Sequence, residues 1–153
     1  MPTHRALSSS FARLAPLALA ALLAAGCAAK GEPPPPAPVG ARENGTLIVT
    51  RADHNRSAEL RVGERLVVRL PENPSTGFTW AIEETDRRLL ALDGTDYAAP
   101  TEGFVGARGL RSFTFTARQP GEVALKFKYW RFWDGDASAT EHYAITVQIR
   151  AGS

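Results

Sequence analysis

Four stretches of the chain alternate apolar and polar residues with a period of two. This pattern is typical of a strand that buries one face and exposes the other. Weaker strand candidates cover residues 46–51, 58–62 and 65–70. The predicted buried faces are Phe78, Trp80 and Ile82; Phe113, Phe115 and Ala117; Val123, Leu125, Phe127 and Tyr129; and Tyr143, Ile145, Val147 and Ile149.

Turn-forming residues separate these stretches at short intervals. Gly63, Pro120-Gly121 and Gly135 each lie between two candidate strands, and glycine and proline favour tight turns there. Only residues 83–92 are compatible with a helix, of one or two turns at most. No alternation of strands with helices is present. The pattern predicts an all-β fold, an immunoglobulin-like antiparallel β-sandwich of about seven strands over residues 45–153.

The first 26 residues have the composition of a signal peptide. Arg5 and Arg13 precede an apolar run over residues 14–26, which is too short for a membrane span. Cys27, the single cysteine, follows at once in a sequence similar to a bacterial lipoprotein cleavage box, although Leu23 lies one position too early. An ordinary cleavage site is the alternative. Because a lone cysteine in an exported protein has no disulfide partner, we predict that Cys27 is lipidated.

Residues 27–44 contain a proline-rich run and are predicted to form an extended tether. A lipid on Cys27 would anchor the protein to a membrane of the cell envelope. The chain has 18 basic and 16 acidic residues, and Arg5 and Arg13 leave with the signal peptide. The remaining side chains are therefore balanced in charge, which argues against a nucleic-acid partner.

The sequence has little of the chemistry that enzymes need. His54 and His142 are far apart and have no partner at the spacing of metal ligands. The chain contains no Gly-x-Ser-x-Gly motif and no phosphate-binding glycine loop. The adjacent Glu83 and Glu84 are most simply explained as solvated strand residues. We expect no metal, no cofactor and no catalytic residue.

Three loops are unusual instead. Residues 73–78 combine proline, glycine and polar residues directly before a strand, which limits the conformations of the loop. Residues 102–110 contain three glycines, and residues 129–134 contain Trp130, Arg131 and Trp133. Tryptophan and arginine are the residue types that dominate binding interfaces. The alternatives are that the tryptophans belong to the core and that the glycine loop is an ordinary hairpin connection.

Together the three loops resemble the motifs of chagasin-like inhibitors of papain-like cysteine peptidases. In that family the motifs are Asn-Pro-x-Thr-Gly-Phe, Gly-x-Gly-Gly and Arg-Pro-Trp, in this order. The resemblance extends over roughly residues 45–150. This chain has Arg108 in place of a glycine and Phe132 in place of the usual proline. The corresponding residues are Asn73, Pro74, Ser75, Thr76, Gly77 and Phe78; Gly106, Ala107, Arg108 and Gly109; and Arg131, Phe132 and Trp133.

The resemblance implies a reversible, non-covalent inhibitor that fills the peptidase cleft with these three loops. Ser75 and Thr76 would lie nearest the catalytic cysteine and histidine of the peptidase. Gly106–Gly109 would run along one wall of the cleft, and Arg131 with Trp133 would pack on the other. The inhibitor is expected to be monomeric. Because Phe132 lacks the φ constraint of proline, the third loop is expected to be less preorganised.

A second hypothesis is an envelope lipoprotein with no inhibitory activity. Its aromatic residues Trp130, Phe132 and Trp133 would then bind a glycan or a partner protein. The two hypotheses differ in whether the domain inhibits a papain-like peptidase.

Overall fold

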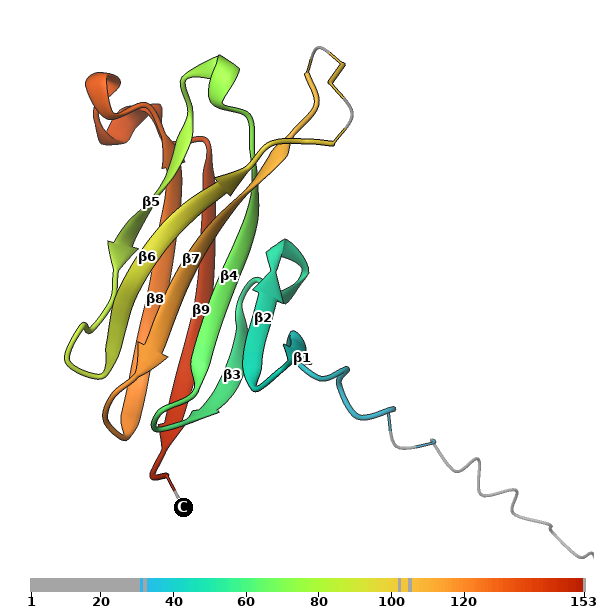
Figure 1. Cartoon of the computed structure of the whole chain (residues 1–153), viewed down its shortest axis with the longest axis vertical. Coiled ribbons are helices and arrows are strands. Elements are labelled where there is room, and N and C mark those ends of the chain that lie inside the picture. Colours follow the sequence, from blue (N-terminus) through green and yellow to red (C-terminus); the bar gives the residue numbers. More distant parts are fainter. Residues whose placement is uncertain (1–30, 32, 102, 105, 153) are drawn as a thin grey trace, which may run out of the picture. The chain divides into compact units, whose positions relative to one another are not determined.

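The computed structural model describes residues 31, 33–101, 103–104 and 106–152. The signal peptide predicted over residues 1–26, and with it Cys27, lies outside the described residues. Residues from Pro36 onwards form one compact unit, an immunoglobulin-like sandwich of nine strands in two sheets (Figure 1). The predicted all-β class is confirmed. In the described part of the chain, no helix is long and apolar enough to cross a membrane.

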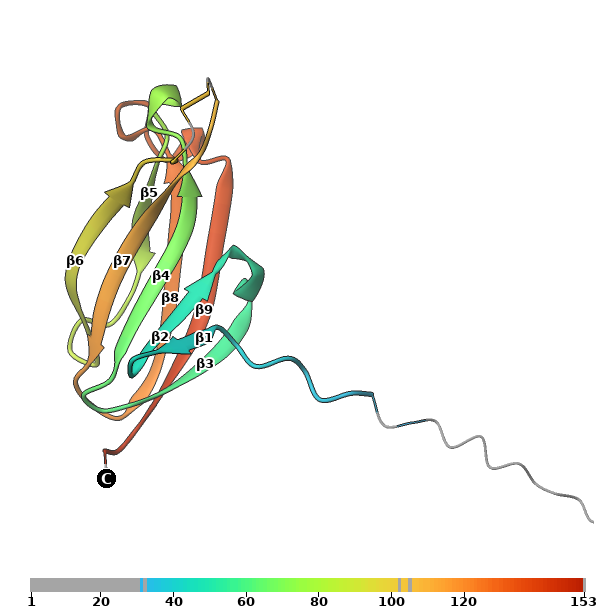
Figure 2. The same ribbon diagram turned by 45° about the vertical axis from the view of Figure 1, so that its right-hand side comes forward.

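The two sheets contain five and four strands, and Figure 2 shows them stacked face to face. The first has the order β1 (Ala41–Glu43), β2 (Thr46–Thr50), β4 (Arg65–Glu72), β7 (Gly109–Ala117) and β6 (Leu90–Ala98). The second has the order β3 (Arg56–Arg61), β9 (Glu141–Arg150), β8 (Gly121–Trp130) and β5 (Thr79–Glu84). Short 3₁₀ turns occupy Arg51–Asp53, Pro74–Thr76, Phe132–Asp134 and Asp136–Ser138.

Most neighbouring strands are antiparallel, as predicted, but two pairs are parallel. They are β2 with β4 and β3 with β9. The chain leaves β2 in the first sheet, reverses into β3 in the second, and reverses again into β4. Two reversals bring β4 back beside β2 in the same direction.

The helix considered for residues 83–92 is wrong. The strand β5 continues to Glu84, and a turn follows in which the Asp86 carbonyl accepts hydrogen bonds from the amides of Leu89 and Leu90, at 3.2 and 2.8 Å. Leu90 then begins β6, where it is fully buried opposite Ala117. Burial of this side chain in the sandwich outweighs the weak helical preference of the segment.

Two strands, β1 and β6, were not predicted and raise the number to nine. The strand β1 lies within residues 27–44, so the folded part of the chain begins before Gly45. The predicted inward faces of the other strands are confirmed. Phe115, Phe127 and Tyr143 are among the largest fully buried side chains.

The buried Asp53 carboxylate holds residues 36–43, which we call the N-terminal segment, against the sandwich. It accepts hydrogen bonds from the amides of Gly40 and Thr50, both at 3.0 Å, and from the Arg56 guanidinium at 3.3 Å. Asp53 is only 6% exposed. Since Gly40 lies directly before β1, this carboxylate fixes the position at which the chain enters the first sheet.

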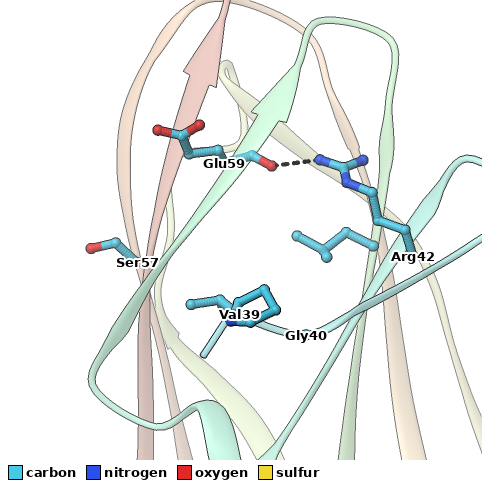
Figure 3. Close-up of a pocket in the computed structure, with 7 residues that line it drawn as sticks. Val39, Gly40, Arg42, Ser57 and Glu59 are labelled. Carbon is cyan, nitrogen blue, oxygen red and sulfur yellow. Dashed lines mark hydrogen bonds between the residues drawn. The ribbon is translucent and has the colours of Figure 1, made fainter. Parts of the chain in front are cut away.

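A second contact in this region crosses from one sheet to the other. Arg42 in β1 donates to the main-chain carbonyl of Glu59 in β3 at 3.0 Å and to the carboxylate of Glu64 at 3.1 Å. Figure 3 shows the hollow beneath this contact, with Val39, Gly40 and Ser57 around it. The N-terminal segment thus covers the side of the sandwich where β1 and β3 are the edge strands.

We predict that Asp53→Ala lowers the free energy of unfolding by about 2 kcal/mol, because it leaves two part-buried amides without their acceptor. Urea denaturation followed by tryptophan fluorescence measures this change. Glu43→Ala is the control, since it removes an exposed carboxylate from β1. Equal stability of the two variants would contradict the role given to Asp53.

Candidate functional site

The three loops singled out in the sequence lie at one end of the sandwich (Figure 1). Strand register requires this arrangement. Glu72 at the end of β4 pairs with Gly109 at the start of β7, and Thr79 at the start of β5 pairs with Trp130 at the end of β8. The loops after β4, β6 and β8 therefore leave the two sheets at the same level. We call residues 73–78 the first loop, residues 99–108 the glycine loop, and residues 131–140 the third loop.

The first loop is stabilised by its own hydrogen bonds. The Asn73 side chain accepts from the amide of Ser75 at 3.2 Å and from its hydroxyl at 2.6 Å. The Thr76 hydroxyl donates to the Asn73 carbonyl at 2.8 Å. Gly77 ends the turn with φ of +78°, a conformation that glycine adopts without strain. Pro74, Ser75 and Thr76 are exposed, so the loop presents a short rigid tip.

The base of the first loop rests on a buried carboxylate. Glu72 is 1% exposed. It accepts from the Trp80 amide at 3.0 Å and the Thr79 hydroxyl at 3.1 Å. The Arg111 guanidinium donates to both carboxylate oxygens, with its shortest contact at 2.6 Å. These hydrogen bonds to Glu72 raise the pKa of Arg111 above its ordinary value. The Asn73 amide also donates to the Tyr129 hydroxyl at 3.2 Å.

The third loop packs directly on the first. Arg131 donates from Nε and from a terminal nitrogen to the Thr76 carbonyl, at 3.2 and 3.0 Å. Its guanidinium carbon lies 4.4 Å from the centre of the Phe78 ring, within cation–π distance. The ring of Trp133 covers Gly77, where an added Cβ would lie 2.6 Å from the ring. The first and third loops therefore form one packed unit.

The third loop contains two short 3₁₀ turns, Phe132–Asp134 and Asp136–Ser138. The Ser138 hydroxyl accepts from the Arg131 amide at 3.0 Å and donates to the Gly135 carbonyl at 2.6 Å. Phe132 packs edge-on against Trp133, with ring centres 5.0 Å apart. Phe132 is 68% exposed and Trp133 is 58% exposed. The loop is thus ordered and still displays two aromatic side chains.

Trp130 belongs to the strand below and not to the exposed tip. It is partly buried, and the Lys128 ammonium lies 3.8 Å from its ring. Tyr129 beside it points inward, where it contacts Phe78 and Trp80. Tyr129 is therefore a core residue. Trp130 lies on the face of its strand, where it contacts Lys128.

Most of the described residues of the glycine loop are exposed. Phe104 is 67% exposed and Arg108 is also exposed. Gly106 has φ of +92° with open space around it. Gly109 differs, because it is the buried first residue of β7, and a Cβ there would lie 2.3 Å from the Ala98 carbonyl oxygen. The absence of a side chain at Gly109 allows β7 to pack closely against the end of β6.

Sequence reasoning missed Glu72, Arg111 and Ser138. A signal for the first two was present. Glu72 continues the inward alternation of Leu66, Val68 and Leu70, and Arg111 precedes that of Phe113, Phe115 and Ala117. Two opposite charges at inward-facing positions near the ends of neighbouring strands indicate an ion pair. Nothing in the sequence marks Ser138, whose partners depend on the local turns.

The arrangement can bind a partner but offers no catalytic group at the tip. Residues 74–76 carry only hydroxyls as functional groups, and no base is hydrogen-bonded to either one. Among the residues that the structure describes, no cluster of three or more histidine, cysteine or acidic side chains could hold a metal ion. Three loops with a rigid centre and exposed aromatic flanks form a surface suited to insertion into a cleft.

Two known proteins are similar to this chain in sequence. Chagasin from Trypanosoma cruzi is 30% identical over 104 residues, which cover 65% of this chain and 94% of chagasin. Amoebiasin-2 from Entamoeba histolytica is 26% identical over 104 residues, 67% of this chain and 85% of that protein.

The fold is also found among solved structures. The crystal structure of a cysteine protease inhibitor from Entamoeba histolytica matches 69% of this chain and 95% of its own, with a TM-score of 0.61 and 21% identity. The solution structure of amebosin matches with a TM-score of 0.58 and 23% identity, over 71% of this chain and 100% of its own. These two likenesses concern the fold.

A family model provides the assignment. The model of the chagasin family of peptidase inhibitors matches residues 59–147, more than half of the chain. The matched region runs from β3 to β9 and includes all three loops. The chain belongs to the chagasin family of peptidase inhibitors.

Proposed function

We propose that this protein is a reversible, non-covalent inhibitor of papain-like cysteine peptidases, and that its three loops fill the active-site cleft. Family membership supports inhibition of peptidases, and the similar protein from Entamoeba histolytica is an inhibitor of cysteine proteases. The observation that carries the proposal is the support of the first loop. Its exposed tip is held by Arg131 on one side and by Glu72 and Tyr129 below.

Inhibition would follow from occupancy of the cleft without covalent chemistry. The tip residues Ser75 and Thr76 would face the catalytic dyad. Because the loop is already ordered by its own hydrogen bonds, binding would cost little conformational entropy. Such an interface buries roughly 800 Å² on each partner, a size that supports tight binding when the contacts are preorganised.

The flanking loops would have different roles. Arg131 already uses its guanidinium on Thr76 and Phe78, so we infer that it positions the first loop more than it contacts the peptidase. Phe132 and Trp133 would supply the apolar contact on that wall of the cleft. Phe104 and Arg108 would face the opposite wall.

Titration of papain with the soluble domain, residues 28–153, tests the proposal. We expect stoichiometric and reversible loss of peptidase activity, because the three loops lie at the same end of the sandwich and the tip of the first loop is exposed. Full activity of papain and of a second papain-like enzyme at micromolar domain would reject the proposal. In that case the exposed Phe132 and Trp133 would favour the envelope-binding hypothesis, which a pull-down with Trp133→Ala as control would test.

A glycine substitution examines whether contact between the loops matters. Gly77→Ala introduces a Cβ 2.6 Å from the Trp133 ring, at φ of +78°, and is expected to weaken inhibition of papain at least about tenfold. Gly45→Ala is matched to it, since Gly45 has φ of +77° with nothing within 4 Å and lies in the β1–β2 turn. Both variants carry the same backbone strain of about 1 kcal/mol. Equal inhibition constants for the two variants would show that the contact with Trp133 is unimportant.

We also propose that Cys27 carries a lipid that anchors the inhibitor to the cell envelope. The apolar run over residues 14–26 directly before a single cysteine supports this proposal. In a bacterial host fed an alkyne fatty acid, the full chain is expected to take up the label and fractionate with membranes. Cys27→Ser is expected to lose both properties. A labelled Cys27→Ser variant would disprove lipidation at this residue.

A further inference from the structure

The Glu72–Arg111 ion pair links the bases of the first loop and the glycine loop, which are far apart in the sequence. Glu72 directly precedes the first loop. Arg111 lies two residues after Gly109, where the glycine loop returns to the sheet. Its guanidinium carbon also lies 5.3 Å from the centre of the Tyr97 ring. Because Tyr97 is in the last part of β6, Arg111 contacts the strand that enters the glycine loop as well as belonging to the strand that leaves it.

The same carboxylate closes the first loop at its other end. Thr79 and Trp80 follow the loop directly, and both donate to one oxygen of Glu72, at 3.1 and 3.0 Å. The other oxygen accepts the shortest hydrogen bond from Arg111, at 2.6 Å. Glu72 is 1% exposed, so water does not compete for these contacts.

We propose that Glu72 and Arg111 are positioning residues, which fix the spacing between the first loop and the glycine loop and thereby control the affinity for the peptidase. This inference rests on the proposed function. Neither side chain has to contact the enzyme. A bidentate arginine–carboxylate pair fixes direction as well as distance. An apolar pair of similar size would fill the space without fixing the direction.

The connection is distinct from the one between the first and third loops. Arg131 contacts the first loop from its exposed side, at the Thr76 carbonyl. Arg111 acts from inside the sandwich, at the root of the loop. Arg111 in β7 and Arg131 in the third loop therefore hold the first loop to its two neighbours. Of their partners, the Glu72 carboxylate that binds Arg111 is buried, whereas Thr76, whose carbonyl binds Arg131, is exposed.

The test compares Glu72→Gln/Arg111→Met with Arg69→Met in the domain of residues 28–153, which contains the whole compact unit. The double variant removes the ion pair, leaves no unpaired charge, and keeps an acceptor for the Trp80 amide. Arg69→Met is the matched control. Arg69 pairs with Ser112, the neighbour of Arg111, and lies on the outer face of the same sheet. Arg111→Lys is a second variant, which keeps the positive charge but cannot form the bidentate contact of a guanidinium with the carboxylate. It is used for the test if the double variant does not fold.

Three measurements are made on each variant: the thermal midpoint, the rate and equilibrium constants for papain, and amide hydrogen exchange of Asn73–Phe78 and Gly106–Gly109. We expect the double variant to bind papain at least about tenfold more weakly than Arg69→Met. Amide exchange is expected to accelerate in both loops together while the amides of β3 stay protected. Val123→Ala changes the core at the opposite end of the sandwich. It is expected to lower the thermal midpoint without weakening papain binding and without accelerating amide exchange in the two loops.

Inhibition constants within about twofold of the Arg69→Met control would overturn the inference, since a misplaced loop is expected to cost much more. An equal loss of affinity in Val123→Ala would also overturn it, because general destabilisation would then explain the result. If the unchanged domain does not inhibit papain, the proposed function fails separately. Hydrogen exchange then decides the positioning role, which is rejected if the two loops do not respond together.

Discussion

The rings of Phe113, Phe115, Phe127 and Tyr143 join the two sheets. Phe127 lies at their centre, 4.8 Å from Phe113 and 6.4 Å from Phe115 on the opposite sheet, and 6.0 Å from Tyr143 on its own. Since side chains alternate along a strand, a shift of one residue would turn these rings outward. The register that buries them is also the register that sets where each strand ends. The position of all three loops therefore depends on this aromatic contact.

Above this core, the loops receive unequal support. The first and third loops are joined by Arg131 and Trp133, and their apolar contacts continue into the core through Phe78 and Tyr129. The glycine loop is connected through its base, where Arg111 contacts Glu72. The first and third loops therefore contact each other directly, whereas the described contacts of the glycine loop with the first loop are at its base.

Much of the architecture could be predicted because period-two alternation records burial directly, as in Val123 to Tyr129. The strand β6 escaped prediction because a bulge between Leu92 and Gly94 interrupts its alternation. The short β1 was missed because its residues are all exposed. The loops were recognised from their residue types, but their mutual contacts were not. The bond from Arg131 to the Thr76 carbonyl joins residues 55 positions apart, and such a contact depends on the folded register.

The fit of the Trp133 ring over Gly77 couples the residue types that these two positions can hold. A larger residue at 77 requires the Trp133 ring to move away or position 133 to change, because an added Cβ would lie 2.6 Å from the ring. Phe104, Arg108 and Phe132 are under less constraint, since their exposed side chains can change without disturbing the sandwich. The departures of this chain from the family motifs, at Arg108 and Phe132, occur at two of these exposed positions. Substitutions at these exposed positions would therefore change the flanks while the packed centre of the three loops stays the same.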